Sequence, residues 1–326
     1  EMIAAHFSDS APGTQPFHLF DDLNPVVTVR QNFDVLQTPA DHVSRSPTDT
    51  FYLDEQRLLR CHTSAHQVDL LASGQRRFLV AGDVYRRDTV DATHYPIFHQ
   101  MEGVRVFERD ELDYTAPRAE QVAAVSADER SQLEGMVRSI FGDVRMRWVD
   151  AYFPFTEPSY ELEIWWGGDW LEVLGCGVMH KAVLGAAGQD HLEGWAFGLG
   201  LERLAMVLFG IPDIRLFWTQ DPRFHEQFQP GRITTFQPYS KYPACFKDVA
   251  FWLPEDRPFH ENDLHELVRG VAGDLAESAT CIDTFTHPKT GRTSHCFRIN
   301  YRSMEVDALQ EQLREAAVAQ LGVELR

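Results

Sequence analysis

The chain has 326 residues, of which 44% are apolar and 12% aromatic, and its formal net charge is −19. This length suits two domains better than one. The acidic balance argues against a nucleic-acid partner, because phosphate contacts need Lys and Arg, although a local basic patch can act within an acidic whole. No run of about eighteen apolar residues is present, so we expect no membrane-spanning helix.

The five cysteines are scattered and never form a Cys-x-x-Cys pair. This pattern argues against a disulfide framework and a structural zinc site, and it fits a reducing compartment. The first residue is Glu1, so we expect a processed or truncated chain from which a targeting peptide could have been lost.

The first two-thirds of the chain has the pattern of strands in a meander with few helices between them. This predicts an antiparallel sheet with flanking helices and no doubly wound sheet. In chain order we expect a helix end at 1–7, a break at 8–16, a strand with a turn at 17–29, a loop at 39–49, paired strands at 76–88 and 95–107, a helix at 117–141, strands at 145–155, 160–166 and 170–179, and a strand that runs through glycines into a helix at 194–210.

A proline-rich stretch at 228–244 is typical of a linker. The order beyond it is strand, helix, strand, strand, helix and short strand, which is the ferredoxin-like pattern. The sequence therefore predicts an α+β fold in two domains, at residues 1–233 and 234–326. The expected elements of the second domain lie at 245–253, 261–275, 278–286, 294–303, 306–322 and the chain end.

The stretch VYRRDTVDATHYPIFHQMEG has cations at one end and a carboxylate at the other. Arg86 stands where a strand gives way to a polar loop, and its guanidinium suits a phosphate or a carboxylate. Glu102, on the returning strand, could hold a substrate ammonium. The alternative is a solvated surface network that also includes Arg87 and Asp88. Spacing alone leaves both interpretations open.

The stretch GWAFGLGLERLAM contains three glycines, which let the backbone approach a ligand closely. Arg203 lies one turn into the helix that follows, and an inward guanidinium there would suit a triphosphate. The alternative is that Glu202 and Arg203 form an exposed pair on an amphipathic helix.

Two further stretches contain candidate binding residues. Phe153 and Phe155 alternate to one face of an expected strand and could line an aromatic pocket by edge-to-face contact, or could be ordinary core. Glu157 and Glu172 are candidate carboxylates for Mg²⁺, or surface acids. In RCHTSAHQ, at 60–67, two histidines lie four residues apart, but no third ligand has a metal-site spacing, so we expect small polar residues that line a binding site.

Together and in this order, these stretches resemble the class II aminoacyl-tRNA synthetases. VYRRD…HYPIFHQMEG resembles motif 2 of that class, and GWAFGLGLERLAM resembles motif 3. HTSAHQ, FHQMEG, YFPFTEPS and WLEVLGCG look like the phenylalanyl-tRNA synthetase catalytic subunit, over about 23–228. The part after the linker resembles the ferredoxin-fold anticodon-binding domain, in the arrangement of the single-chain mitochondrial members.

The resemblance implies ATP-dependent charging of tRNA(Phe) with phenylalanine through a phenylalanyl-adenylate, with Mg²⁺, by a monomer of the mitochondrial matrix. Arg86 would grip the α-phosphate of ATP and Arg203 the γ-phosphate, both in catalytic roles. Glu157 and Glu172 would hold Mg²⁺. The implied substrate-binding residues are His62, Ser64, Ala65, His66, Gln67, Arg86, Thr93, His94, Tyr95, Gln100, Met101, Glu102, Phe153, Phe155, Glu172, Ala196 and Phe197.

Two departures from the family pattern stand out. The motif 1 helix is represented at most by EMIAAHF, which leads us to expect missing upstream sequence, and Val43 replaces a usual proline. Two other functions stay open: a catalytically silent, synthetase-like tRNA-binding protein, and an amino-acid ligase that does not use tRNA. The intact set Arg86, Gln100, Glu102 and Arg203 favours the enzyme.

Overall fold

The computed structural model describes residues 1–8, 15–238 and 244–326, so parts of the predicted break at 8–16 and linker at 228–244 lie outside the described residues. The chain divides into two compact units. The first contains 1–85 and 97–204, and the second contains 86–96 and 205–326. Helix α5 (Leu201–Phe209) runs from one range into the next.

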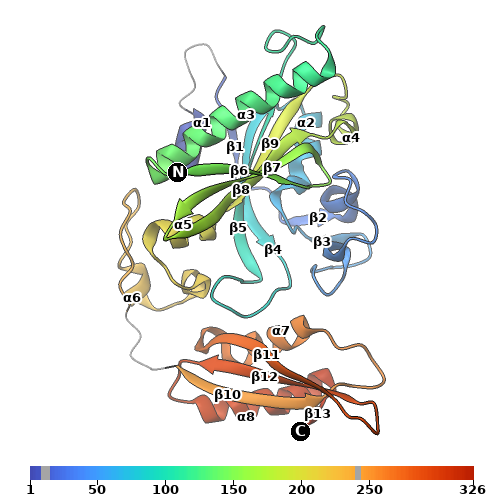
Figure 1. Ribbon diagram of the computed structural model, residues 1–326, viewed down its shortest axis with the longest axis vertical. Helices are drawn as coiled ribbons and strands as arrows, with labels where there is room; N and C mark the ends of the chain where they lie inside the picture. The colour runs from blue at the N-terminus through green and yellow to red at the C-terminus, as the bar shows by residue number, and fades with distance from the viewer. Residues whose placement is uncertain (9–14, 239–243) are drawn as a thin grey trace. The chain divides into compact units, whose positions relative to one another are not determined.

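The first unit is built on a seven-stranded sheet in the order β1-β4-β5-β9-β8-β7-β6 (Figure 1). Only the pair β1 and β4 is parallel, which confirms the predicted antiparallel sheet. A small β2–β3 sheet was not predicted. The elements are α1 (Met2–Ser8), β1 (His18–Phe20), β2 (Val26–Thr28), β3 (Arg57–Leu59), α2 (Gln67–Ala72), β4 (Arg77–Tyr85), β5 (Ile97–Val106), α3 (Arg118–Phe141), β6 (Met146–Ala151), β7 (Thr156–Trp166), β8 (Asp169–Met179), α4 (Lys181–Ala186) and β9 (Gly194–Gly200).

Helices α1 and α3 cover one face of this sheet, and α3 is the long green helix of Figure 1. Phe7 of α1 stacks on Phe197 of β9, with ring centroids 5.4 Å apart. The indole Nε1 of Trp195 donates to Asp128 Oδ2 of α3 at 2.7 Å. Because Trp195 and Phe197 are almost fully buried, this aromatic layer fixes the helices on the sheet.

The strand predicted at 145–155 is shorter than expected. Strand β6 ends at Ala151 and β7 begins at Thr156, so Phe153 and Phe155 lie in the loop between them. Pro154 explains the difference, because it has no backbone N–H to donate to a sheet ladder. The prediction that the two rings alternate on a strand is therefore wrong.

The second unit holds a four-stranded sheet in the order β11-β12-β10-β13, with two helices that contribute to one core with it. This is the predicted ferredoxin-like arrangement. Val90 of the 86–96 loop belongs to the same core. The elements are α6 (Pro222–His225), β10 (Cys245–Trp252), α7 (Glu261–Ala272), β11 (Ala276–Thr286), β12 (Thr293–Tyr301), α8 (Val306–Ala316) and β13 (Glu324–Leu325). Among the described residues, every helix is too short or too polar to cross a bilayer.

The close packing of the helix-covered face generates a stability prediction. A Cβ atom at Gly103 would lie 2.2 Å from Cε1 of the buried Phe197 ring, whereas a Cβ at Gly198 of β9 would meet no atom within 4 Å. We expect Gly103→Ala to lower the free energy of unfolding by about 1–3 kcal/mol, as overpacking does. Gly198→Ala is the matched control and should leave stability nearly unchanged in urea unfolding followed by circular dichroism. Equal stability of the two variants would contradict this packing.

Candidate active site

The sheet face opposite α1 and α3 has a floor of glycines beside two polar side chains. Gln100 and Glu102 of β5 pair with Gly200 and Gly198 of β9, and directly paired residues project from the same face. Gly175 of β8 pairs with Gly198 in turn. Because a Cβ at Gly198 would enter open space, a ligand can lie against the strand backbone there.

Glu102 is a buried carboxyl group at the edge of this floor, with 1% of its surface exposed. Ser64 Oγ donates a hydrogen bond to its Oε2. Its Oε1 is buried and accepts no hydrogen bond from the described residues. Burial raises the pKa of Glu102 to about 7, and the neighbouring polar groups of Ser64 and Gln67 offset only part of the shift. An unpaired buried carboxyl oxygen of this kind suits a ligand cation.

The segment before Ser64 is anchored by Arg60, of which 1% is exposed. Its guanidinium donates to Leu23 O at 3.1 Å, to Asp83 O at 2.7 Å and to Asp83 Oδ1 at 3.0 Å. Arg60 Nη1 also lies 2.9 Å from His66 Nε2. Burial and the nearby cation lower the pKa of His66 to about 4, so this imidazole is neutral and accepts the Arg60 hydrogen bond.

Several predicted binding residues do not direct their side chains to the floor. Ala65 packs in a small core with Phe33 and Leu58. Met101 and Phe197 alternate with Glu102 and Gly198 along their strands, so their side chains lie on the helix-covered face. The structure therefore does not bring these three side chains to the site. Ser64, Gln67, Gln100 and Glu102, in contrast, lie together, with the backbone N–H of Thr63 donating to Gln100 Oε1 at 3.4 Å.

The two predicted pocket aromatics do come together, although from a loop. Phe153 and Phe155 stack with centroids 6.0 Å apart and planes at 18°, not in the expected edge-to-face geometry. The Phe153 ring covers Gly175, where a Cβ would lie 2.6 Å from its Cζ. The ring centroids of Phe155 and His62 are 6.3 Å apart. Phe155 also packs against the hydrophobic core cluster that contains the buried Ala196. The rings thus lie at the Gly175 end of the floor.

At the start of α5, the predicted exposed pair separates into two roles. Arg203 is half-exposed and its Nη1 lies 3.2 Å from Glu172 Oε2. Glu202 is buried instead, and it accepts hydrogen bonds from the backbone N–H of His99 at 2.8 Å and from His99 Nδ1 at 2.6 Å. The hydrogen bond to Glu202 raises the pKa of His99. Only Arg203 of this pair is available to a ligand.

The two predicted Mg²⁺ carboxylates lie far apart. Glu157 is at the start of β7, with Oε2 3.9 Å from His180 Nε2. Glu172 of β8 pairs with Glu163 of β7. Glu163 lies six residues beyond Glu157 on β7, which corresponds to about 20 Å along the strand. The structure therefore does not bring Glu157 and Glu172 around one ion. Burial and the charge of Glu172 raise the pKa of Glu161, so the Glu161 carboxyl group lies close enough to Glu172 to interact with it.

In the second unit, Asp91 orders the 86–96 loop. Its carboxylate accepts hydrogen bonds from the Thr93 and His94 backbone N–H groups at 2.7 and 2.9 Å, and His94 Nδ1 lies 2.7 Å away. Burial opposes the shift, but hydrogen bonds from Thr93 and His94 lower the pKa of Asp91 to about 2. Tyr95 stacks on Trp218 with centroids 5.4 Å apart. Arg86 directly follows the last residue of β4, and its N–H donates to Pro96 O at 2.9 Å.

Two family models match this chain. The model of the class II core domain (F) of the tRNA synthetases matches residues 17–228. The chain belongs to the class II tRNA synthetases. The model of the ferredoxin-fold anticodon binding domain matches residues 240–326 of this synthetase.

Curated relatives cover nearly the whole synthetase chain. The chloroplastic/mitochondrial phenylalanine–tRNA ligase of Arabidopsis thaliana is 55% identical over 95% of this chain and 73% of its own length. The mitochondrial phenylalanine–tRNA ligase of Mus musculus is 51% identical over 100% of this chain and 80% of its own. The Dictyostelium discoideum mitochondrial ligase is 47% identical over 100% of this chain and 83% of its own.

The sequence did not identify four residues that organise this synthetase site: Arg60, Asp83, Asp91 and Glu202. Their partners are distant in the chain or hidden within a polar loop. One signal was available for Arg60, because it stands between two leucines and a cysteine in LLRC, where an unpaired cation would be costly. The sequence also contained a signal for Met101 and Phe197. Side chains alternate between the two faces of a strand, so these residues point to the face opposite that of their neighbours Glu102 and Gly198.

The raised pKa of Glu102 makes stability depend on pH. The folded carboxyl group keeps its proton up to about pH 7, whereas the unfolded chain releases it near 4.5, so stability falls as pH rises between these values. The contribution is up to about 1.4 kcal/mol per pH unit. In Glu102→Gln it should vanish, so the variant should gain stability relative to the parent chain from pH 5 to 7 and hold that gain above. Parallel urea-unfolding curves across this range would contradict the burial of Glu102.

Proposed function

We propose that this protein is a mitochondrial phenylalanine–tRNA ligase that uses ATP to charge tRNA(Phe) through a phenylalanyl-adenylate. Membership of the class II synthetases supports tRNA charging, and the curated relatives carry the phenylalanine–tRNA ligase name. One observation in the site supports phenylalanine as the amino-acid substrate. A buried carboxyl group with an unpaired oxygen stands on a glycine floor whose far end is bounded by two stacked phenylalanines.

In this proposal, phenylalanine lies on the glycine floor. Its ammonium pairs with Glu102 and Gln100, and Ser64 holds the Glu102 carboxyl group in place. Its ring packs against Phe153 and Phe155, with Ala196 setting the depth of the pocket. Binding of a cation favours the ionised form of Glu102, so the raised pKa falls when phenylalanine binds.

Two arginines hold the phosphates of ATP in this proposal. Arg203 binds the γ-phosphate and Arg86 the α-phosphate, while the loop with Thr93, His94 and Tyr95 receives adenine and the tRNA acceptor end. A carboxylate pair beside Arg203 suits Mg²⁺, whose hard oxygen ligands would come from Glu172 and Glu161. When bound, the ion would neutralise phosphate charge. Met101 and Phe197 support the floor from its far side.

The chemistry then needs no enzyme nucleophile. A carboxylate oxygen of phenylalanine attacks the α-phosphorus, the bond from that phosphorus to the bridging oxygen breaks, and pyrophosphate leaves. Arg86 stabilises the charge that develops on the α-phosphate oxygens. A terminal ribose hydroxyl of the tRNA then attacks the carbonyl carbon, and AMP leaves. The enzyme contributes the positions of the reacting groups and electrostatic stabilisation.

The proposed ferredoxin-fold domain, with its boundary at residue 234, recognises tRNA. We assign tRNA contacts to the stretch HPKTGRTSHCFR at 287–298, but Arg292 pairs with Glu255 and Glu324, and Arg298 pairs with Asp248. These ion pairs neutralise much of its charge, so tRNA contacts have to compete with them. We propose that the chain acts as a monomer in the mitochondrial matrix.

Pyrophosphate exchange tests the proposal. We expect exchange that depends on phenylalanine, and transfer of phenylalanine to tRNA(Phe) only when residues 234–326 are present. Arg86→Ala should mainly lower the rate of adenylation, whereas Glu102→Gln should mainly raise the KM for phenylalanine. Binding of tRNA without any exchange would support a catalytically silent protein, and exchange without transfer by the full chain would support a ligase that does not use tRNA.

The shape of the glycine floor leads to a prediction about substrate specificity. Ala196→Gly removes the side chain that sets the depth of the pocket, so the variant should accept para-chlorophenylalanine with kcat/KM raised at least about tenfold, because pocket shape alone discriminates weakly. Gly198→Ala is the opposite change, since it fills open space and should lower kcat/KM for phenylalanine without loss of stability. Unchanged preference in Ala196→Gly, measured by competitive charging, would show that Ala196 lies elsewhere.

A further inference from the structure

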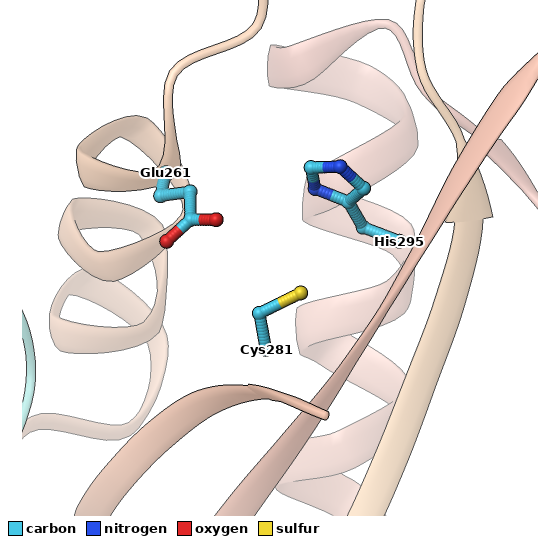
Figure 2. Close-up of side chains that lie close together, drawn as sticks. All are labelled: Glu261, Cys281 and His295. Atoms are coloured by element: carbon cyan, nitrogen blue, oxygen red, sulfur yellow. The ribbon is translucent and has the colours of Figure 1, made fainter. Parts of the chain in front are cut away.

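A cluster of three possible metal ligands lies in the second unit, apart from the residues assigned to phenylalanine and ATP, although its His295 falls within the proposed tRNA patch at 287–298. Glu261, Cys281 and His295 each offer one ligand atom, and these atoms lie within 4.8 Å of one another. Figure 2 shows the three side chains pointing toward a common centre from α7, β11 and β12. Among the described residues, this is the single group of three or more His, Cys, Asp or Glu side chains with such convergent atoms.

The fold brings these residues together across three elements. Cys281 pairs with Phe297, which lies two residues beyond His295 on β12, so Cys281 and His295 are diagonal neighbours on one sheet face. An irregularity in β11 between Cys281 and Asp283 sets this register. Glu261 is the first residue of α7, and its carboxylate approaches the same face from the helix.

The His295 ring is held with one nitrogen unused. Phe259 contacts it edge-on, with centroids 5.8 Å apart, and Phe297 packs beside it at 6.1 Å. Its Nδ1 is buried and has no hydrogen-bond partner in the described part of the chain, which is costly for a ring nitrogen. In Figure 2 this nitrogen is on the side of the ring that faces Glu261 and Cys281.

We propose that Glu261, Cys281 and His295 form a Zn²⁺ site with an open fourth position. One thiolate, one imidazole and one carboxylate are a ligand set that suits zinc, and a tetrahedral ion would draw the ligand atoms to separations of about 3.3–3.8 Å, a shift of about 1 Å. Cys281 Sγ, now 3.6 Å from Asp283 O and 3.7 Å from Thr284 Oγ1, loses its proton to solvent as the zinc–sulfur bond forms. The ion ties the first turn of α7 to the β11–β12 hairpin.

Linear spacing could not reveal this site. The cysteine pattern argued against structural zinc because no two cysteines are close in sequence, yet this cluster uses one cysteine and takes its ligands from three separate elements. The open fourth position makes the site exchangeable, in contrast to a closed four-ligand site.

Metal binding to the full chain tests the proposal. The chelator-treated protein, in excess Mg²⁺ to saturate hard-ligand sites, is titrated with Zn²⁺ against a chromophoric chelator. We expect one Zn²⁺ per chain, with affinity at least about tenfold lower in Cys281→Ser and lowered in Glu261→Gln. Cys296→Ser is the matched control, since Cys296 is also half-exposed and lies next to His295 but on the opposite sheet face.

Cobalt supplies a second, independent measurement. Co²⁺ bound at the site should give a thiolate-to-metal charge-transfer band that Zn²⁺ abolishes, present in the parent chain and in Cys296→Ser but lost in Cys281→Ser. Circular dichroism and the melting temperature without metal check that each variant folds. Equal Zn²⁺ affinity in the parent chain and Cys281→Ser, loss of binding in Cys296→Ser, or no thiolate band in the parent chain would each overturn the proposal.

Discussion

The buried guanidinium of Arg60 is the contact on which the binding face depends. It forms one hydrogen bond with the backbone of Leu23, one with the side chain of His66 and two with Asp83 of β4. Breaking a buried charged network leaves its partners unsatisfied, at a cost of about 3–5 kcal/mol. Gly82 permits this arrangement, because a Cβ there would lie 2.0 Å from the Arg60 Nη2 atom. The position of Ser64, and through it of Glu102, follows from this anchor.

The two faces of the seven-stranded sheet divide the work of folding and binding. Large aromatic side chains such as Trp195 and Phe197 fill the face under α1 and α3 and are almost fully buried there. The other face places glycines opposite Gln100 and Glu102, and so leaves backbone uncovered. Alternation along β9 therefore puts a packing residue and a binding position next to each other in sequence. A single strand serves both purposes because its side chains point alternately to the two faces.

Strand pattern and motif order predicted the α+β fold, the β4–β5 pair and the ferredoxin-like order. They could do so because these features follow from short-range alternation of apolar residues. The prediction was less successful where a single residue changed the local geometry, as Pro154 does by ending β6 before the two phenylalanines. It also could not find Glu202 as the partner of His99, since 103 residues separate them in the chain and only the sheet brings them together. Side-chain roles that depend on burial, such as the neutral state of His66, required the packed structure.

The glycine floor has a consequence for how specificity in this protein can change. Glycine is the smallest residue, so any substitution at Gly175, Gly198 or Gly200 can only add atoms to the ligand side of the sheet. On the same face of β9, Ala196 alone has a side chain, so it alone can lose volume and keep its place in the strand. Point mutation is therefore asymmetric at this site: many single changes narrow the range of accepted ligands, and very few widen it. Selectivity of this kind resides in the space that the chain leaves unfilled.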